Sequence, residues 1–239
     1  MKKVQFLSLL VIFSFIFQSI SAQNKFEVHI GGALPQGGFA DNNTDQAIYG
    51  SSGCAETGVL LGAKFLHQFS SIKDLSLTFS ADYSINSLSQ KFKDEVSSSL
   101  KNQINNTSVS LNFKYPSYTN IPILVGLNYD ILINPQTDFF INGGIGINFV
   151  SVSDLTATAK FNGLSATETI STNSAQGFAG QIGGGILFGK RISLGINYNL
   201  LGSYKLSGKD KASNDAEVSI ASLGSLSINT LNLYIGYRF

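Results

Sequence analysis

Two histidines and one cysteine are the residues best suited to nucleophilic or metal chemistry in this chain of 239 residues. His29 and His67 fall in segments of alternating polarity and point to opposite faces of neighbouring strands, so a shared metal site is not expected. Neither has a Ser–Asp relay at close spacing. Cys54 has no activating neighbour and, being single, forms no internal disulfide. We expect no catalytic residue, no metal and no cofactor, and predict that the chain is not an enzyme.

Charged residues are the second group of candidates, because within the alternating segments they share the polar face with His29. Successive side chains of a strand point to opposite faces, so residues two apart lie on the same face. Charges on an enclosed face must be paired or hydrated. We therefore interpret this set as a lumen charge network: Glu27, His29, Glu56, Lys64, Asp82, Asp130 and Arg238.

An export signal precedes the segments that position these residues. Residues 1–22 have a basic start, an apolar middle and a small-residue end before Gln23, which is typical of a secretory signal peptide. The apolar run is shorter than the roughly 20 residues that a transmembrane anchor needs. We predict a signal peptide over 1–22 and a single domain over 23–239.

Eight segments of the mature chain alternate apolar and polar residues with a period of two, as half-buried strands do. The connections between them alternate strictly between short turns and long polar loops. Barrels of bacterial outer membranes have an even number of strands, short periplasmic turns and long outer loops. The strands are expected at about 25–34, 55–70, 74–88, 119–133, 138–152, 177–189, 190–205 and 225–239, with long loops at about 35–54, 89–118, 153–176 and 206–224.

The two faces of these strands differ in a way that favours a membrane barrel. The polar face is small and rich in glycine, whereas the other face carries Ile, Leu, Phe and Tyr from end to end. A secreted soluble barrel or sandwich is the alternative, but eight inward rows of large apolar side chains would crowd a narrow lumen. A net charge of +1 provides no electrostatic footprint for nucleic acid. We predict an all-β fold: an eight-stranded antiparallel up-and-down transmembrane β-barrel with periplasmic termini, present as a monomer in the bacterial outer membrane.

The predicted topology pairs charges inside the lumen. Glu27 and Arg238 lie near the periplasmic ends of the two strands that close the barrel, so we expect them to face each other across the seam. Lys64 and Asp82 flank the same short turn and are expected to be near neighbours. This salt-bridged filling would replace an apolar core, because eight strands leave no open channel once side chains fill the interior. A narrow pore for small solutes is the alternative, and an outer-leaflet lipid-modifying enzyme is a further one.

Several short motifs carry a resemblance to a known family. They lie at 26–34 with Gly31 and Gly32, at 35–39, at 120–123 and at 231–239. The chain resembles the small outer-membrane barrels of the OmpA/OmpX type and is most similar to the PorT-like "outer membrane protein beta-barrel domain" family. The resemblance implies outer-membrane lipid as the surroundings and the outer-membrane assembly machinery as a partner. That machinery would read the C-terminal pattern of Leu231, Leu233, Ile235, Tyr237 and Phe239.

The resemblance implies no single activity, and a fold alone does not supply one. We predict that the long loops are the functional surface. Family members serve in adhesion, envelope integrity and secretion-related roles. We expect a solvated cover over the barrel mouth, or contacts to an extracellular or envelope protein or glycan. We also expect some of Tyr198, Tyr204, Tyr234 and Tyr237 to form an aromatic girdle at the membrane surface. The candidate loop contacts are Lys91, Phe92, Lys93, Lys209 and Lys211.

Overall fold

The computed structural model describes residues 23–43, 52–104, 109–162, 164–212 and 218–239, so the predicted signal peptide lies outside the described residues. Eight long strands form a closed antiparallel barrel in which each strand pairs with its neighbours in the chain order of the ring. The predicted eight-stranded up-and-down barrel is therefore confirmed. Its strands are β1 (Asn24–Gln36), β2 (Gly58–Gln68), β3 (Leu75–Ser87), β5 (Ser117–Asn134), β6 (Thr137–Val152), β9 (Ala175–Phe188), β10 (Ile192–Ala212) and β11 (Val218–Arg238).

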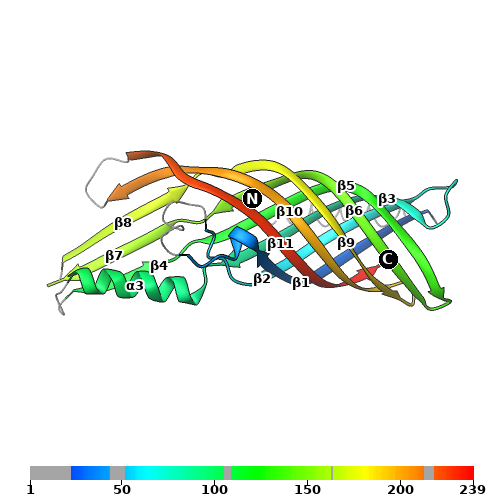
Figure 1. Ribbon diagram of the computed structural model, residues 1–239, viewed down its shortest axis with the longest axis horizontal. Helices are drawn as coiled ribbons and strands as arrows, with labels where there is room; N and C mark the ends of the chain where they lie inside the picture. The colour runs from blue at the N-terminus through cyan, green and yellow to red at the C-terminus, as the bar shows by residue number, and fades with distance from the viewer. Residues whose placement is uncertain (1–22, 44–51, 105–108, 163, 213–217) are drawn as a thin grey trace, which may run out of the picture.

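The ring closes because β11 pairs with β1 on one side and with β10 on the other. Closure leaves no exposed sheet edge along the barrel wall, and lipid could not satisfy the hydrogen bonds of such an edge. Three short turns connect β2 to β3, β5 to β6 and β9 to β10, at the end where β1 begins and β11 ends (Figure 1). We call this end the turn end, and the opposite end the loop end.

The long connections hold more regular structure than the predicted solvated loops. The first contains the 3-10 turn η1 (Gly37–Phe39), and the second contains α3 (Gln90–Ile104) and β4 (Ser110–Lys114). The third folds into the hairpin of β7 (Leu155–Phe161) and β8 (Leu164–Thr172), while β10 and β11 continue through most of the fourth. Part of the expected cover over the barrel mouth is therefore regular structure, because backbone pairing of the strand segments satisfies groups that a loop would leave to water.

An open sheet projects beyond the barrel mouth, in the order β10, β8, β7, β4, and β11 pairs with the other edge of β10 there (Figure 1). The sheet exists because β10 is longer than the barrel wall and pairs with β8 through residues 208–212. The hairpin partner β7 then pairs with β4. We call β4, β7, β8 and the part of β10 that pairs with β8 the platform.

The barrel interior is layered along its axis rather than uniformly polar. Charged and amide side chains fill the half nearer the turn end, with a small apolar cluster of Leu60, Phe140, Leu187 and Tyr234 among them. The half nearer the loop end is filled by a larger apolar cluster that includes Phe39, Leu124, Val150, Leu201 and Ile228. The prediction of a polar lumen throughout was therefore wrong for the loop-end half. Leu124 and Val150 alternate in step with the inward polar residues of their strands, so they also point inward. Their side chains form part of this apolar filling.

Candidate functional site

An arginine near the C-terminus is the centre of the charge network. Arg238 lies directly opposite Glu27 across the β1–β11 seam, and its Nε donates to Glu27 Oε2 at 3.1 Å. The pairing predicted at the seam is thus present. A guanidinium nitrogen of Arg238 also donates to Asp130 Oδ2 at 3.2 Å, on the opposite wall of the barrel. Both carboxylates are buried, so one guanidinium neutralises charges from two strands.

Two lysines extend this network around the turn end. Lys64 Nζ lies 3.9 Å from Glu27 Oε1, and Lys25 Nζ lies 3.7 Å from Asp130 Oδ2. Asn128 donates to the other oxygen of Asp130 at 2.7 Å. Glu27 and Asp130 therefore have two cationic neighbours each, which offsets the cost of removing these carboxylates from water.

Asp82 has a direct partner other than Lys64, its expected near neighbour. The register places Asp82 opposite Gly62 rather than Lys64, and its Oδ1 lies 3.0 Å from His29 Nε2. Lys64 instead lies opposite Glu27. The expectation rested on the distance of each residue from the β2–β3 turn. That distance does not determine which residue of which neighbouring strand a side chain contacts. His29 and Asp82 form a buried pair one step above the Glu27–Arg238 layer.

Glu56 is not part of the lumen network. The strand β2 begins at Gly58, so Glu56 lies in the loop before it and its side chain is exposed. Its carboxylate lies 3.8 Å from Lys93 Nζ of α3. The parity that seemed to point Glu56 inward does not apply, because alternation holds only within a strand.

Aromatic rings that the sequence analysis did not assign to the lumen cover the charge layer. Phe140 and Tyr234 point inward, and Lys64 Nζ lies 5.9 Å and 5.7 Å from their ring centroids. The Tyr234 ring lies against Gly195, where an added Cβ would be 2.2 Å from Tyr234 Cζ. The imidazole of His29 fits over Gly62 in the same way, with Nε2 at 2.3 Å from an added Cβ. Inward glycines therefore provide the space that these large side chains occupy.

A row of asparagines lies above the charge layer. Asn128, Asn142, Asn197 and Asn232 are connected by the pairings of β5, β6, β9, β10 and β11, with Gly183 between the second and third. All four side chains are buried, and each has an amide oxygen with no hydrogen-bond partner among the described residues. Buried polar groups normally find a protein or water partner. The geometry thus favours hydration of this middle layer.

The loop end of the lumen is closed by the first loop. Phe39 of η1 is fully buried, and its ring meets Tyr118 edge-on at a centroid distance of 5.1 Å. The Tyr118 hydroxyl donates to the Gly53 carbonyl at 2.8 Å, and Ala55 N donates to Phe39 O at 3.0 Å. Cys54 lies in this same cluster with no exposed surface. Burial raises the pKa of the Cys54 thiol, and the hydrogen bond with Ser52 Oγ offsets only part of this increase.

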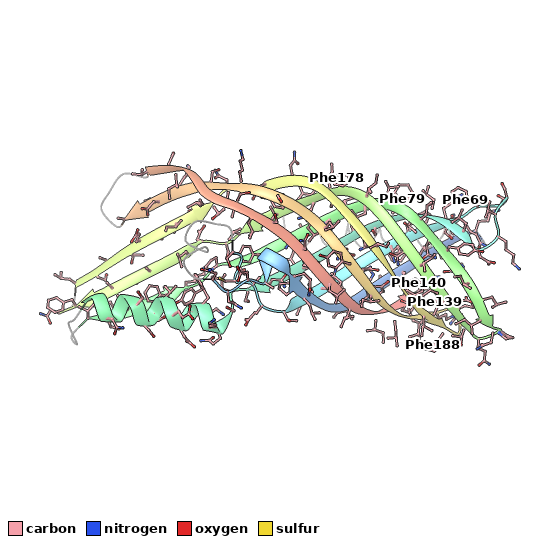
Figure 2. All side chains as sticks on the ribbon, viewed as in Figure 1. Phe69, Phe79, Phe139, Phe140, Phe178 and Phe188 are labelled. Carbon is pink, nitrogen blue, oxygen red and sulfur yellow. The ribbon has the colours of Figure 1, made fainter. Side chains whose placement is uncertain are left out.

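The outer surface of the barrel is a continuous apolar belt. Every strand of the ring contributes large exposed apolar side chains, and several phenylalanines point away from the wall (Figure 2). On β5 the outward positions run from Ile121 to Ile131, about 33 Å of strand, which a tilt of about 40° reduces to roughly 25 Å along the axis. Soluble monomers rarely expose apolar patches larger than about 300–600 Å².

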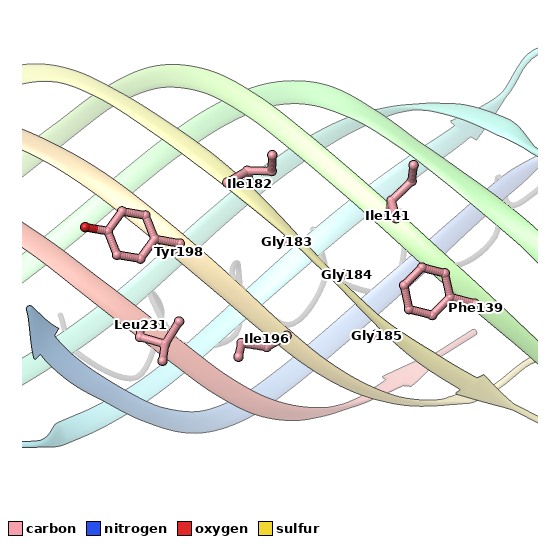
Figure 3. A pocket seen from close by; sticks show the side chains of 9 residues that line it. All are labelled: Phe139, Ile141, Ile182, Gly183, Gly184, Gly185, Ile196, Tyr198 and Leu231. Atoms are coloured by element: carbon pink, nitrogen blue, oxygen red, sulfur yellow. The ribbon is translucent and has the colours of Figure 1, made fainter.

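The belt contains a hollow of about 460 Å³ around Gly184 (Figure 3). Gly184 is at an outward position of β9 and has no side chain. The outward side chains of the neighbouring strands therefore surround an open space at this point. The hollow is lined by Phe139, Ile141, Ile182, Gly183, Gly184, Gly185, Ile196, Tyr198 and Leu231.

The tyrosines predicted to form a girdle divide into two pairs. Tyr198 and Tyr237 point outward and are partly exposed, whereas Tyr204 and Tyr234 are buried inside the barrel and cannot belong to a girdle. The parity of β11 could have assigned Tyr234 to the interior, because it alternates with Ile235. The C-terminal pattern lies on the outer face, with exposed side chains at Leu233, Ile235, Tyr237 and Phe239 and an intermediate one at Leu231. Its recognition by assembly machinery stays a prediction.

The candidate loop contacts separate into two places at the loop end. Lys91, Phe92 and Lys93 begin α3, where Lys91 lies 3.8 Å from Glu95 and Phe92 packs against the apolar cluster of the lumen. Phe92 therefore contributes to the packing of this cluster. Lys209 and Lys211 lie on the platform segment of β10 and are exposed.

The remaining histidine, His67, pairs with an asparagine of the neighbouring strand. His67 Nδ1 lies 2.7 Å from Asn24 Oδ1 at the turn end. By strand alternation His67 is on the outer face of the sheet, whereas His29 and Asp82 are on the inner face. No group of His, Cys, Asp or Glu side chains with the arrangement of a metal site occurs among the described residues. In the same part of the chain, no helix combines the length and apolar character needed to cross a membrane.

No protein-family model matches the sequence, and comparison with curated proteins gives no match. The PorT-like assignment therefore stays a prediction. Among solved structures, the chain is similar to Neisserial surface protein A, with 12% identity, a TM-score of 0.40, and coverage of 91% of this chain and 96% of the other. It is also similar to Ail of Yersinia pestis, with 14% identity, a TM-score of 0.39 and coverage of 91% and 99%. A major outer membrane protein of Thermus thermophilus gives 10% identity, a TM-score of 0.46 and coverage of 90% and 99%.

Proposed function

We propose that this chain is an outer-membrane barrel that carries an interaction platform on the external side of the membrane. The observation that supports this proposal best is the apolar belt, which surrounds all eight strands and has the height of a bilayer core. The export signal predicted over 1–22 is compatible with this location. Outer-membrane lipid would be the surroundings, and the assembly machinery would be a partner during insertion.

The role we propose is structural or interactive rather than catalytic. The lumen is occupied by the charge layer and the apolar cluster, so the interior offers no wide route for solutes. The most elaborate feature outside the belt is the platform, which the chain builds from segments of three long connections. Adhesion, envelope integrity and scaffolding of a membrane complex all need such a rigid external surface. We propose that a single copy of the chain serves one of these roles by binding an extracellular or envelope partner.

Cysteine accessibility in whole cells tests the proposed topology. In a Cys54→Ser background, we would compare Val218→Cys near the platform, Lys73→Cys at the turn end and Val125→Cys in the belt. A membrane-impermeant maleimide should label only the first in intact cells and the second after outer-membrane permeabilisation. The third should resist labelling until the protein is denatured. Labelling of the Lys73→Cys protein in intact cells, or of the Val125→Cys protein in the native membrane, would refute the topology.

A narrow pore is the second candidate function, and the asparagine row favours it. Amide oxygens without a protein partner in the middle layer are suited to a hydrated interior. Planar-bilayer recording of the refolded protein decides between the candidates. We expect silence, because Phe39 and its neighbours close the loop end and Arg238 bridges the turn end. Steady conductance that changes as the luminal carboxylates titrate would favour the pore.

A further inference from the structure

One face of the platform is basic. In antiparallel strands, residues directly opposite each other point to the same face. The pairings connect Lys211 of β10 to Thr169 of β8, Thr169 to Thr156 of β7, and Thr156 to Lys114 of β4. These four residues therefore form one row across the platform.

The next rows add lysines and hydroxyl groups to the same face. Lys160 pairs with Ser165 of β8 and Ser110 of β4, and Lys209 pairs with Ser171. The alternation of each strand then completes this surface, which we call the lysine face. Its members are Ser110, Asn112, Lys114, Thr156, Thr158, Lys160, Ser165, Thr167, Thr169, Ser171, Lys209 and Lys211.

The charge of the lysine face has one sign. It carries four exposed lysines, and no acidic residue of the described platform strands lies on it. The acidic residues of these strands, Glu168 and Asp210, fall on the opposite face by parity. That opposite face also carries Leu111, Phe113, Ala157, Ala159 and Phe161. The platform is thus amphipathic, and its positive potential is concentrated on one side.

The helix α3 lies on the other side of the platform. Tyr115 directly follows β4, and its ring centroid lies 5.8 Å from that of Phe113. The Tyr115 hydroxyl donates to the Lys93 carbonyl at 3.0 Å and lies 2.8 Å from Ser97 Oγ, both in α3. The helix, drawn below β4 and β7 in Figure 1, therefore lies beside the face that carries Phe113. By strand alternation the lysine face is the opposite one.

We propose that the lysine face binds an extracellular polysaccharide that carries sulfate, phosphate or carboxylate groups. This inference rests on the proposed function, because it requires the platform to be external. The four lysines supply charge complementarity to an anionic chain. Between them lie hydroxyl and amide groups suited to sugar hydroxyls, and two of these, Thr158 Oγ1 and Thr167 Oγ1, lie 3.2 Å apart.

The composition of the face disfavours other polyanions. It has no aromatic side chain on which an unpaired base could stack, as binding of single-stranded nucleic acid normally uses. It also has no large apolar residue that could anchor an acidic protein. Lys211 and Lys114 are three strands apart, about 14 Å, and Lys160 lies about 13 Å along β7 from their row. A flat chain with spaced charges fits these separations better than a compact anion.

Binding of dextran sulfate, with uncharged dextran as the reference, tests the proposal on the full-length protein in nanodiscs. We would compare the wild type with K114Q/K160Q/K211Q and with K73Q/K91Q/R191Q, which removes the same charge elsewhere. We expect salt-sensitive binding of dextran sulfate by the wild type and no binding of dextran. The lysine-face variant should lose about tenfold or more in affinity, and the control variant should lose less than about twofold. Unfolding on heating, followed by gel mobility, verifies that each barrel is folded.

Polyglutamate of matched charge and the variant T156V/T158V/T167V separate sugar recognition from charge alone. We expect weaker binding of polyglutamate than of dextran sulfate, and a loss for the threonine variant with dextran sulfate only. Equal losses for the lysine-face and control variants would overturn the proposal, as would equal binding of the two polyanions. Either result could occur with a correctly inserted barrel, which the cysteine labelling establishes separately. A failure of this inference is therefore distinct from a failure of the proposed function.

Discussion

Arg238 reaches across the whole lumen to Asp130, with 3.2 Å between the guanidinium nitrogen and the carboxylate oxygen. The two residues lie on β11 and β5, which are four places apart in a ring of eight strands and therefore opposite each other. The same guanidinium binds Glu27 on the adjacent strand. One side chain thus connects the closing seam to the far wall.

Removal of this guanidinium should destabilise the barrel strongly. The variant Arg238→Ala leaves Glu27 and Asp130 buried with fewer cationic partners, and breaking a buried pair in this way costs about 3–5 kcal/mol. Reversible urea unfolding of protein refolded in vesicles would measure the change. Arg191→Ala removes an exposed arginine from the neighbouring turn and should change stability by less than about 0.5 kcal/mol. Equal stability of the two variants would contradict the structural role of Arg238.

The stability lost when an inward glycine is substituted should depend on the aromatic ring that covers the glycine. An added methyl group at Gly195 meets Tyr234 at 2.2 Å, so Gly195→Ala should cost about 1–3 kcal/mol by overpacking. In a Tyr234→Ala background the same change should cost much less, and the double-mutant cycle should show coupling of about 1 kcal/mol or more. Gly143→Ala, which meets nothing closer than 3.6 Å, provides the control. Additive effects at Gly195 and Tyr234 would show that the ring does not occupy this space.

The apolar belt predicts that the cost of an exposed charge depends on its height along the strands. Val125 lies near the middle of the belt on β5, and Val218 lies beyond it at the start of β11. Val125→Arg should lose about 2–4 kcal/mol of stability in a bilayer, because arginine at the midplane is desolvated. Val218→Arg should be nearly neutral, since this side chain is in water. Similar values for both variants in vesicle unfolding experiments would argue against a membrane belt.

The thiol of Cys54 should be protected in the folded barrel. It is fully buried, and burial raises its pKa above the usual value of 9.0, so the reactive thiolate is scarce at neutral pH. Thiol modification should be slower by roughly 100-fold or more in the native protein than in the urea-unfolded protein. Because the folded pKa is raised, the stability contribution of Cys54 is present below about pH 9 and is lost at higher pH. An exposed cysteine at Val218 supplies the reference rate, and rapid modification of native Cys54 would show that the first loop opens readily.

The sequence was sufficient to predict the strands and the seam pair, because both depend on local alternation and on the order of the chain. The bounds of the eight barrel strands differ from expectation by only a few residues at most ends, with the largest extensions at the loop ends of β10 and β11. The Glu27–Arg238 pair follows from closure of the ring, which fixes the neighbours of the first and last strands. The Asp82–His29 pair could not be predicted from distances to a turn, since strand register decides it.

The platform was beyond reach of the same analysis. Its strands are short, with five residues in β4 and seven in β7. Segments this short carry few repeats of the alternating pattern. Their pairing also joins segments from separate loops, as when β4 pairs with β7. The lysine face arises only from that pairing, because Lys114, Lys160 and Lys211 are distant along the chain.

The two strands β10 and β11 each extend over 21 residues, from the turn end through the belt and beyond the barrel mouth, with register shifts in their pairing after Leu200 and Leu206. A pulling force on the platform is therefore transmitted along continuous backbone to the seam beside β1. The bridge from Arg238 to Asp130 stands at the far end of that line and resists separation of the wall. The barrel in this arrangement acts as a mechanical anchor, in which load applied to the platform is carried down to the opposite rim.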